Sequence, residues 1–165
     1  MKRHRALISL AAGLIALFPT AFLGQNVDLP PQSADLRALV ETERNLQMYA
    51  LDPISMANQL PGSPDAEALQ MLGDAAHGSA NELRAVTDLL AIYENMKCDT
   101  DRALLKPLLL DRLHLYSRLI DLEAEKAAIP LGLKQPPTVT KNALQLRDDL
   151  KAAKNRLDAV AVSLN

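Results

Sequence analysis

The strongest periodic signal in the chain is carried by residues 143–164, which read ALQLRDDLKAAKNRLDAVAVSL. Apolar side chains recur there every three or four residues, which places them on one stripe of an α-helix. The members of this stripe are Ala143, Leu146, Leu150, Ala153, Leu157, Val160 and Leu164. Because two of them are alanines, we expect close packing inside a helical bundle rather than an extended coiled coil. The alternative is that helix 139–164 presents the stripe to a second copy of the chain or to another protein.

Outward from this helix, glycine and proline mark the ends of the other helices. The expected helices cover residues 33–52, 63–78, 79–97, 100–128 and 138–164. Nowhere do β-branched and aromatic residues alternate between turn signals, as they would in a β-strand. The sequence therefore predicts an all-α fold, an antiparallel helical bundle of four to five helices that forms one domain over residues 33–165.

Serine residues stand where three of these helices are expected to begin. Ser33 and Ser63 precede apolar-periodic segments and can accept the first free backbone N–H groups. Ser79 and Glu82 match the Ser-x-x-Glu capping box, and they follow Gly78, a common helix stop. We therefore expect one helix to end at Gly78 and the next to begin at Ser79.

Proline and threonine bound the remaining helices. Pro53 is expected to end the first helix and to open a connector toward the second, because it cannot donate a helical hydrogen bond. Thr100 or Asp101 is expected to cap the helix that reaches residue 128, and Thr138 or Thr140 the last helix.

The helix over residues 100–128 carries a wide apolar arc. Its members include Leu105, Leu108, Leu109, Leu113, Leu115, Tyr116, Leu119, Ile120 and Leu122. An arc of this width is typical of a helix with neighbours on several sides. We therefore expect this helix to be central in the bundle.

The first 24 residues have the pattern of an export signal. A basic start, Met1–Arg5, is followed by an apolar run over Ala6–Phe18 that Pro19 closes. We expect residues 1–24 to be a signal peptide, with a retained membrane anchor as the alternative, and residues 25–32 to be an extended lead-in. The protein is then exported, to the periplasm or the medium, and meets the membrane only if the signal is retained.

The charge of the mature part argues against a nucleic-acid partner. The chain holds 18 Lys and Arg and 20 Asp and Glu; without Lys2, Arg3 and Arg5, 15 basic residues remain against 20 acidic ones, a net charge of −5. Phosphate binding requires clustered Lys and Arg, and the mature part also holds neither Phe nor Trp for base stacking.

Two Asp-x-x-His pairs, Asp74 with His77 and Asp111 with His114, place both side chains of each pair on one helix face. The spacing is similar to the Glu-x-x-His spacing of di-metal carboxylate bundles. However, His114 projects onto the polar side of its helix, and His77 directly precedes an expected helix end. We expect neither a metal site nor a cofactor, and no catalytic signature points to an enzyme.

Charged residues interrupt the apolar faces of two helices. Glu43 and Gln47 lie at the centre of the apolar face of the first helix, and Arg112 and Glu123 lie among the leucines of helix 100–128. If these two helices pack face to face, Glu43 meets Arg112 in the interior. One interpretation is an ion pair that fixes the register of the helices; the other is an interhelical pocket in which these residues bind a small ligand.

Cys98 is the only cysteine, so a disulfide within the chain is impossible. In an oxidising compartment such a thiol is either buried as a small apolar group or paired with another chain. The sequence is therefore compatible with a buried Cys98 and with an intermolecular disulfide.

These features favour an exported, non-enzymatic helical bundle that acts as an interaction or assembly module of the cell envelope. The alternative is a bundle that binds a small ligand or a metal through its interhelical polar residues.

Overall fold

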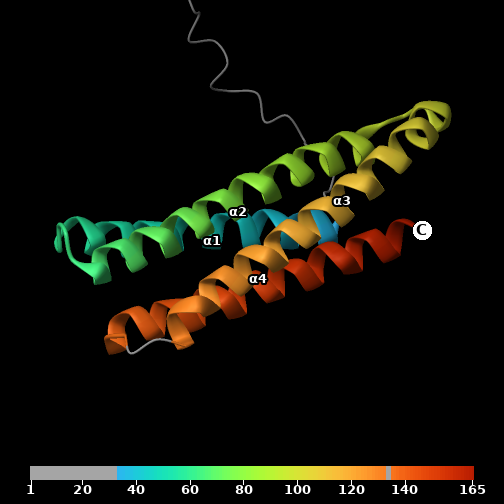
Figure 1. Ribbon diagram of the computed structural model, residues 1–165. Helices are drawn as coiled ribbons and strands as arrows, with labels where there is room; N and C mark the ends of the chain where they lie inside the picture. The colour runs from blue at the N-terminus through green and yellow to red at the C-terminus, as the bar shows by residue number, and fades with distance from the viewer. Residues whose placement is uncertain (1–32, 133–134) are drawn as a thin grey trace, which may run out of the picture. The chain divides into compact units, whose positions relative to one another are not determined.

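The computed structural model describes residues 33–132 and 135–165, so the expected signal peptide and the lead-in over residues 25–32 lie outside the described residues. The described part is all-α and confirms the predicted helical bundle, with four α-helices (Figure 1). The elements are α1 (Ala34–Asn58), α2 (Pro64–Asn95), α3 (Asp99–Ala128), the short 3-10 helix η2 (Ile129–Gly132) and α4 (Pro137–Leu164). None of the described helices combines the length and apolarity needed to cross a membrane.

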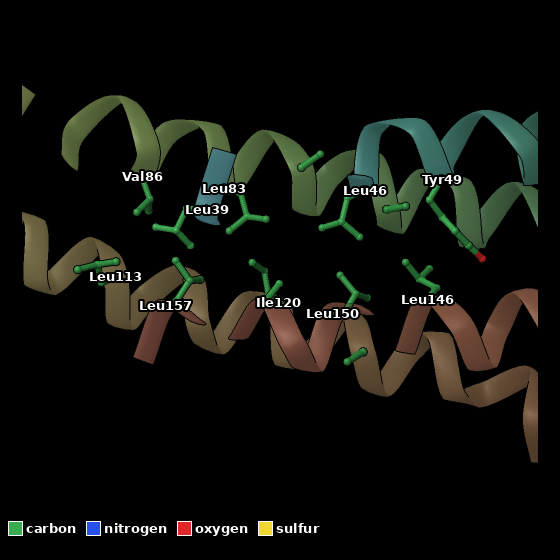
Figure 2. Packing of buried hydrophobic residues seen from close by; sticks show 14 of the residues in the cluster. Leu39, Leu46, Tyr49, Leu83, Val86, Leu113, Ile120, Leu146, Leu150 and Leu157 are labelled. Atoms are coloured by element: carbon green, nitrogen blue, oxygen red, sulfur yellow. The ribbon is translucent and has the colours of Figure 1, made fainter. Parts of the chain in front are cut away.

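The four helices run up and down, each antiparallel to the one before it (Figure 1). Helix α1 packs mainly on α2, and α3 packs mainly on α4, so the bundle consists of two helical hairpins. The core lies between these hairpins. Figure 2 shows Leu39, Leu46, Leu83 and Val86 of α1 and α2 pointing toward Leu113, Ile120, Leu146, Leu150 and Leu157 of α3 and α4.

The periodic stripe of residues 143–164 lies inside the bundle, as expected for close packing. Its members Ala143 to Val160 are buried, five of them completely, and only Leu164 at the helix end is partly exposed. Tyr49 of α1 donates a hydrogen bond of 2.7 Å from its hydroxyl to the backbone oxygen of Asn142, which fixes α4 against α1. The stripe is therefore occupied by the chain's own helices.

Two of the predicted helix caps are confirmed. The Ser33 hydroxyl accepts a hydrogen bond from Leu36 N over 3.0 Å, and the Ser63 hydroxyl accepts one from Ala66 N over 3.1 Å. Ser33 also donates from its backbone nitrogen to the Glu94 carboxylate over 3.2 Å, which ties the start of α1 to the end of α2.

The predicted break at Gly78 and Ser79 is wrong, because α2 continues through both residues. Ser79 is completely buried on the same face as Ala76 and Leu83, so it belongs to the core stripe rather than to a cap. Burial of a continuous stripe along a 32-residue helix outweighs the modest cost of the two glycines within it, Gly73 and Gly78. The bundle consequently has four helices and no capping box between Ser79 and Glu82.

Three other predicted ends differ from the structure. Helix α1 continues through Pro53 to Asn58, because Pro53 is buried in the bundle and the packing of this turn compensates for the missing backbone donor. The residue before α3 is Cys98 and the residue before α4 is Pro136, and neither makes a side-chain cap.

Candidate functional site

The predicted interior residue Glu43 is buried, but its partner is not Arg112. Gln47 Nε2 donates to Glu43 Oε1 over 3.0 Å, and Arg84 Nε of α2 lies 3.4 Å from the same oxygen. Arg84 is mostly exposed and reaches over the edge of the bundle to this carboxylate. Glu43 therefore joins α1 to α2, the helix that α1 contacts most, rather than to α3.

The other two predicted site residues lie elsewhere. Arg112 is exposed on α3, because the side of α3 that carries it faces away from α1. Glu123 is half-buried and pairs with Lys126 one turn along the same helix. The structure therefore does not bring Glu43, Gln47, Arg112 and Glu123 together into one pocket.

Glu123 instead faces Glu82 across a cleft of about 280 Å³ between α2 and α3, which Met71, Gly78 and Lys126 also line. Burial raises the pKa of Glu82, and the charge of Glu123 raises it further, while Lys126 opposes both effects. One carboxylate oxygen of Glu82 is buried without a hydrogen-bond partner among the described residues. The lining of this cleft is acidic, with Asp74, Glu82 and Glu123 against Lys126.

Helix α3 is joined to α4 on its other side by Asp158. The Ser117 hydroxyl donates to Asp158 Oδ1 over 2.6 Å, and Lys154 Nζ lies 2.7 Å from Oδ2. Burial alone would raise the pKa of Asp158, but the hydrogen bonds from Lys154 and Ser117 outweigh it and lower the pKa below 3.8. This contact fixes the register of α3 on α4.

The two Asp-x-x-His pairs lie on the surface of the bundle. His77 with Asp74 and His114 with Asp111 are all exposed. Within the described part of the chain, no three His, Cys, Asp or Glu side chains gather in a way that could hold a metal ion.

Cys98 is exposed in the join between α2 and α3, so the expectation that it is buried is wrong. The residue stands at the N-cap of α3, where the chain turns at the end of the hairpin and no helix covers it. An intermolecular disulfide stays a prediction.

A further feature is an apolar surface on α3 and the first residue of η2. Leu108, Leu115, Leu122 and Ile129 are exposed at intervals of seven residues, from 39% for Leu115 to 57% for Ile129. Leu105, one turn before Leu108, and Leu119 are half-buried, and Arg112 and Lys126 complete the pattern of a coiled-coil stripe. We call this set the outer seam: Leu105, Leu108, Arg112, Leu115, Leu119, Leu122, Lys126 and Ile129.

The outer seam lies on a different side of α3 from the residues that build the core. Leu113 and Leu115, for example, are two positions apart and therefore about 200° apart around the helix. The buried side of α3 comprises Leu109, Leu113, Ser117, Ile120, Ala124 and Ala127. The expectation of a central α3 is therefore wrong: the helix packs on α4 and α2, and Leu108, Leu115 and Leu122 of its wide apolar arc are exposed.

Charged residues flank the outer seam. Asp111, Arg118 and Glu125 follow one another at seven-residue intervals along its edge, and all three are exposed. Neither Asp111 nor Arg118 takes part in a salt bridge within residues 33–132 and 135–165. The edge thus offers charges of both signs to a neighbouring molecule.

The signal for the outer seam was present in the sequence, as leucine or isoleucine at every seventh position from Leu108 to Ile129. In the sequence these positions merge into one arc, because the core residues of α3 lie between them. Separating the two stripes by their angle around the helix would have indicated two faces rather than one.

Comparisons with known proteins give no match: no protein-family model, no curated protein and no solved structure matches the chain. The candidate site is therefore defined by the chain's own residues, chiefly the outer seam and the cleft beside it.

Proposed function

We propose that this chain is an exported, non-enzymatic interaction module of the cell envelope, which binds a partner helix along the outer seam of α3. The observation that carries the proposal is the row of exposed leucine and isoleucine side chains at heptad spacing on a helix whose opposite face is fully packed. A monomeric protein rarely exposes a long contiguous apolar surface that has no function.

The shape of the surface supports a helix as the partner. An amphipathic helix binds through apolar residues spaced three, four and seven positions apart, and the outer seam has this spacing. Arg112 and Lys126 interrupt the apolar row, and their long aliphatic stems can pack against a partner while their charged ends reach water. Such interruptions weaken a coiled coil but restrict it to one register.

Photo-crosslinking in the native organism tests this proposal. A photoreactive amino acid is placed at Leu115 or at Leu122, and as a control at Leu144 of α4, whose exposure of 39% equals that of Leu115. We expect a discrete protein adduct from the two outer-seam positions and none from the control. Equal labelling of all three positions, or of none, would contradict the proposal.

The export part of the proposal has its own test. Fractionation of the native cells and amino-terminal sequencing of the protein should give a chain that lacks the first two dozen or so residues outside the inner membrane. A full-length chain confined to the cytoplasm would contradict export and leave the outer-seam proposal standing.

A second candidate function is binding of a small cationic ligand in the cleft between Glu82 and Glu123. The observation that favours it is the partly buried Glu82 carboxylate at the wall of this cleft, one oxygen of which has no hydrogen-bond partner among the described residues. Titration calorimetry with spermidine, compared between the unaltered protein and E82Q, tests this function. Binding that E82Q abolishes would support it, and equal heats from both proteins would exclude it.

A further inference from the structure

We infer, resting on the function proposed above, that the helix bound by the outer seam is α3 of a second copy of this chain. The two helices would lie antiparallel, related by a twofold axis that crosses α3 at the level of residues 113–114. A twofold contact uses the same surface on both copies, so the surface must be complementary to itself. The outer seam meets this condition in one register.

In that register, leucines face leucines and opposite charges face each other, except at the centre, where Arg112 faces Leu115 and only its aliphatic stem can pack. The facing pairs are Leu105 with Leu122, Leu108 with Leu119, Arg112 with Leu115 and Asp101 with Lys126, each formed twice by symmetry. At the edge of the contact, Asp111 of each copy lies beside Arg118 of the other. The contact would run over about 38 Å, since the facing pairs extend from residue 101 to residue 126 and each residue rises 1.5 Å.

The other arrangements bring like charges together. A parallel pair places Arg112 beside Arg112 and Lys126 beside Lys126 in the centre of the contact. An antiparallel pair shifted by one heptad in one direction places Arg118 beside Arg118, and a shift in the other direction places Asp111 beside Asp111. At the edge of the contact, charge complementarity therefore selects the antiparallel register with its centre at residues 113–114, in which the two Arg112 residues stand in adjacent layers rather than directly opposite each other.

Cys98 provides a direct test of this register, because it would face Ile129 of the second copy. Within one chain these two positions stand at opposite ends of α3, about 46 Å apart along the axis, and cannot be bridged. We expect I129C, with the native Cys98 in place, to form a covalent dimer on mild oxidation, with Cys98 linked to the new cysteine by peptide mass spectrometry. The control L144C, on the outer side of α4, should not give a dimer linked through its new cysteine.

A charge-exchange series tests the same register without a disulfide. In D111R, two arginines meet at each edge of the contact, and in R118D two aspartates meet there. Sedimentation equilibrium should show a dimer for the unaltered full chain, roughly tenfold weaker dimers for D111R and R118D, and recovery to within about threefold in D111R/R118D. Both edge residues are exposed, so circular dichroism should show unchanged helix content in every variant.

The outcomes separate this inference from the proposed function. A strict monomer at millimolar concentration, together with a crosslink from Leu115 to a different protein in cells, would overturn the inference that the partner is a second copy. The proposed function as an interaction module would then remain. A Cys98–Cys98 disulfide in the unaltered protein would overturn the antiparallel orientation, because that register places the two thiols at opposite ends of the dimer. A monomer without any adduct at the outer seam would overturn both.

Discussion

The stripe of α4 and the outer seam of α3 are two heptad patterns of similar length with different surroundings. The α4 stripe packs against the other helices of its own chain, whereas the outer seam faces away from them. The two also differ in composition, since the α4 stripe is wholly apolar and the outer seam places Arg112 and Lys126 among its leucines. A long cationic side chain is tolerated in a stripe that can reach water and is costly in one that cannot.

The largest expected difference between the two patterns concerns stability. L150A in the α4 stripe should lower the free energy of unfolding by about 3 kcal/mol, because it leaves a cavity in the core. L115A in the outer seam should change it by less than about 0.5 kcal/mol. Urea unfolding at micromolar protein concentration measures both. Equal losses would mean that the outer seam is packed as tightly as the core.

A glycine pair sharpens the same contrast on α2. A methyl group at Gly73 would overlap Ile54 of α1, whereas nothing lies near Gly78, which faces outward. G73A should therefore cost about 1–3 kcal/mol through overpacking, and G78A should stabilise by about 1 kcal/mol through its higher helix propensity. Thermal unfolding followed by circular dichroism should show melting temperatures that move in opposite directions. A stabilising G73A would show that α1 and α2 do not touch there.

A smaller effect is expected at the contact that holds α3 on α4. D158N should cost about 1 kcal/mol at pH 7, because the buried Ser117 hydroxyl loses a charged acceptor. Because the pKa of Asp158 is lowered in the folded state, its carboxylate stabilises the fold above pH 3.8. This stabilisation is lost as the pH falls below 3.8. Urea unfolding of both proteins across pH 2–7 should show the difference shrinking at the acidic end. If the stability difference between the two proteins did not depend on pH, the charge of Asp158 would not be its cause.

The smallest effect is expected at the cleft beside the outer seam. Because the folded-state pKa of Glu82 is raised above 4.5, its ionisation destabilises the fold as pH rises through that pKa. E82Q should therefore be slightly more stable than the unaltered protein at pH 7, and the two should converge below pH 4.5. Melting temperatures of both proteins at pH 4 and pH 7 test this prediction. If E82Q were the less stable protein at pH 7, the Glu82 carboxylate would make a favourable contact.

The sequence was sufficient for the fold class and for the core of α4, because an uninterrupted apolar period forces a helix to bury that face. The sequence wrongly predicted a break at Gly78. Both a helix end and a continuous helix are locally acceptable there, and packing against the other helices favours the continuous helix. Arg84 could not be identified as the partner of Glu43, since pairing between helices depends on which faces meet. For the same reason the pattern of α3 could not separate neighbours within the chain from a neighbour outside it.

The arrangement in two helical hairpins has a consequence for how the chain folds. Because α1 packs mainly on α2 and α3 mainly on α4, most native contacts join segments that follow each other along the chain. Chains with such local contacts close short loops and fold on the microsecond to millisecond timescale. We expect each hairpin to form early and the docking of the two hairpins to limit the folding rate. Mutations between the hairpins, such as at Leu146, should then slow folding more than mutations within one hairpin.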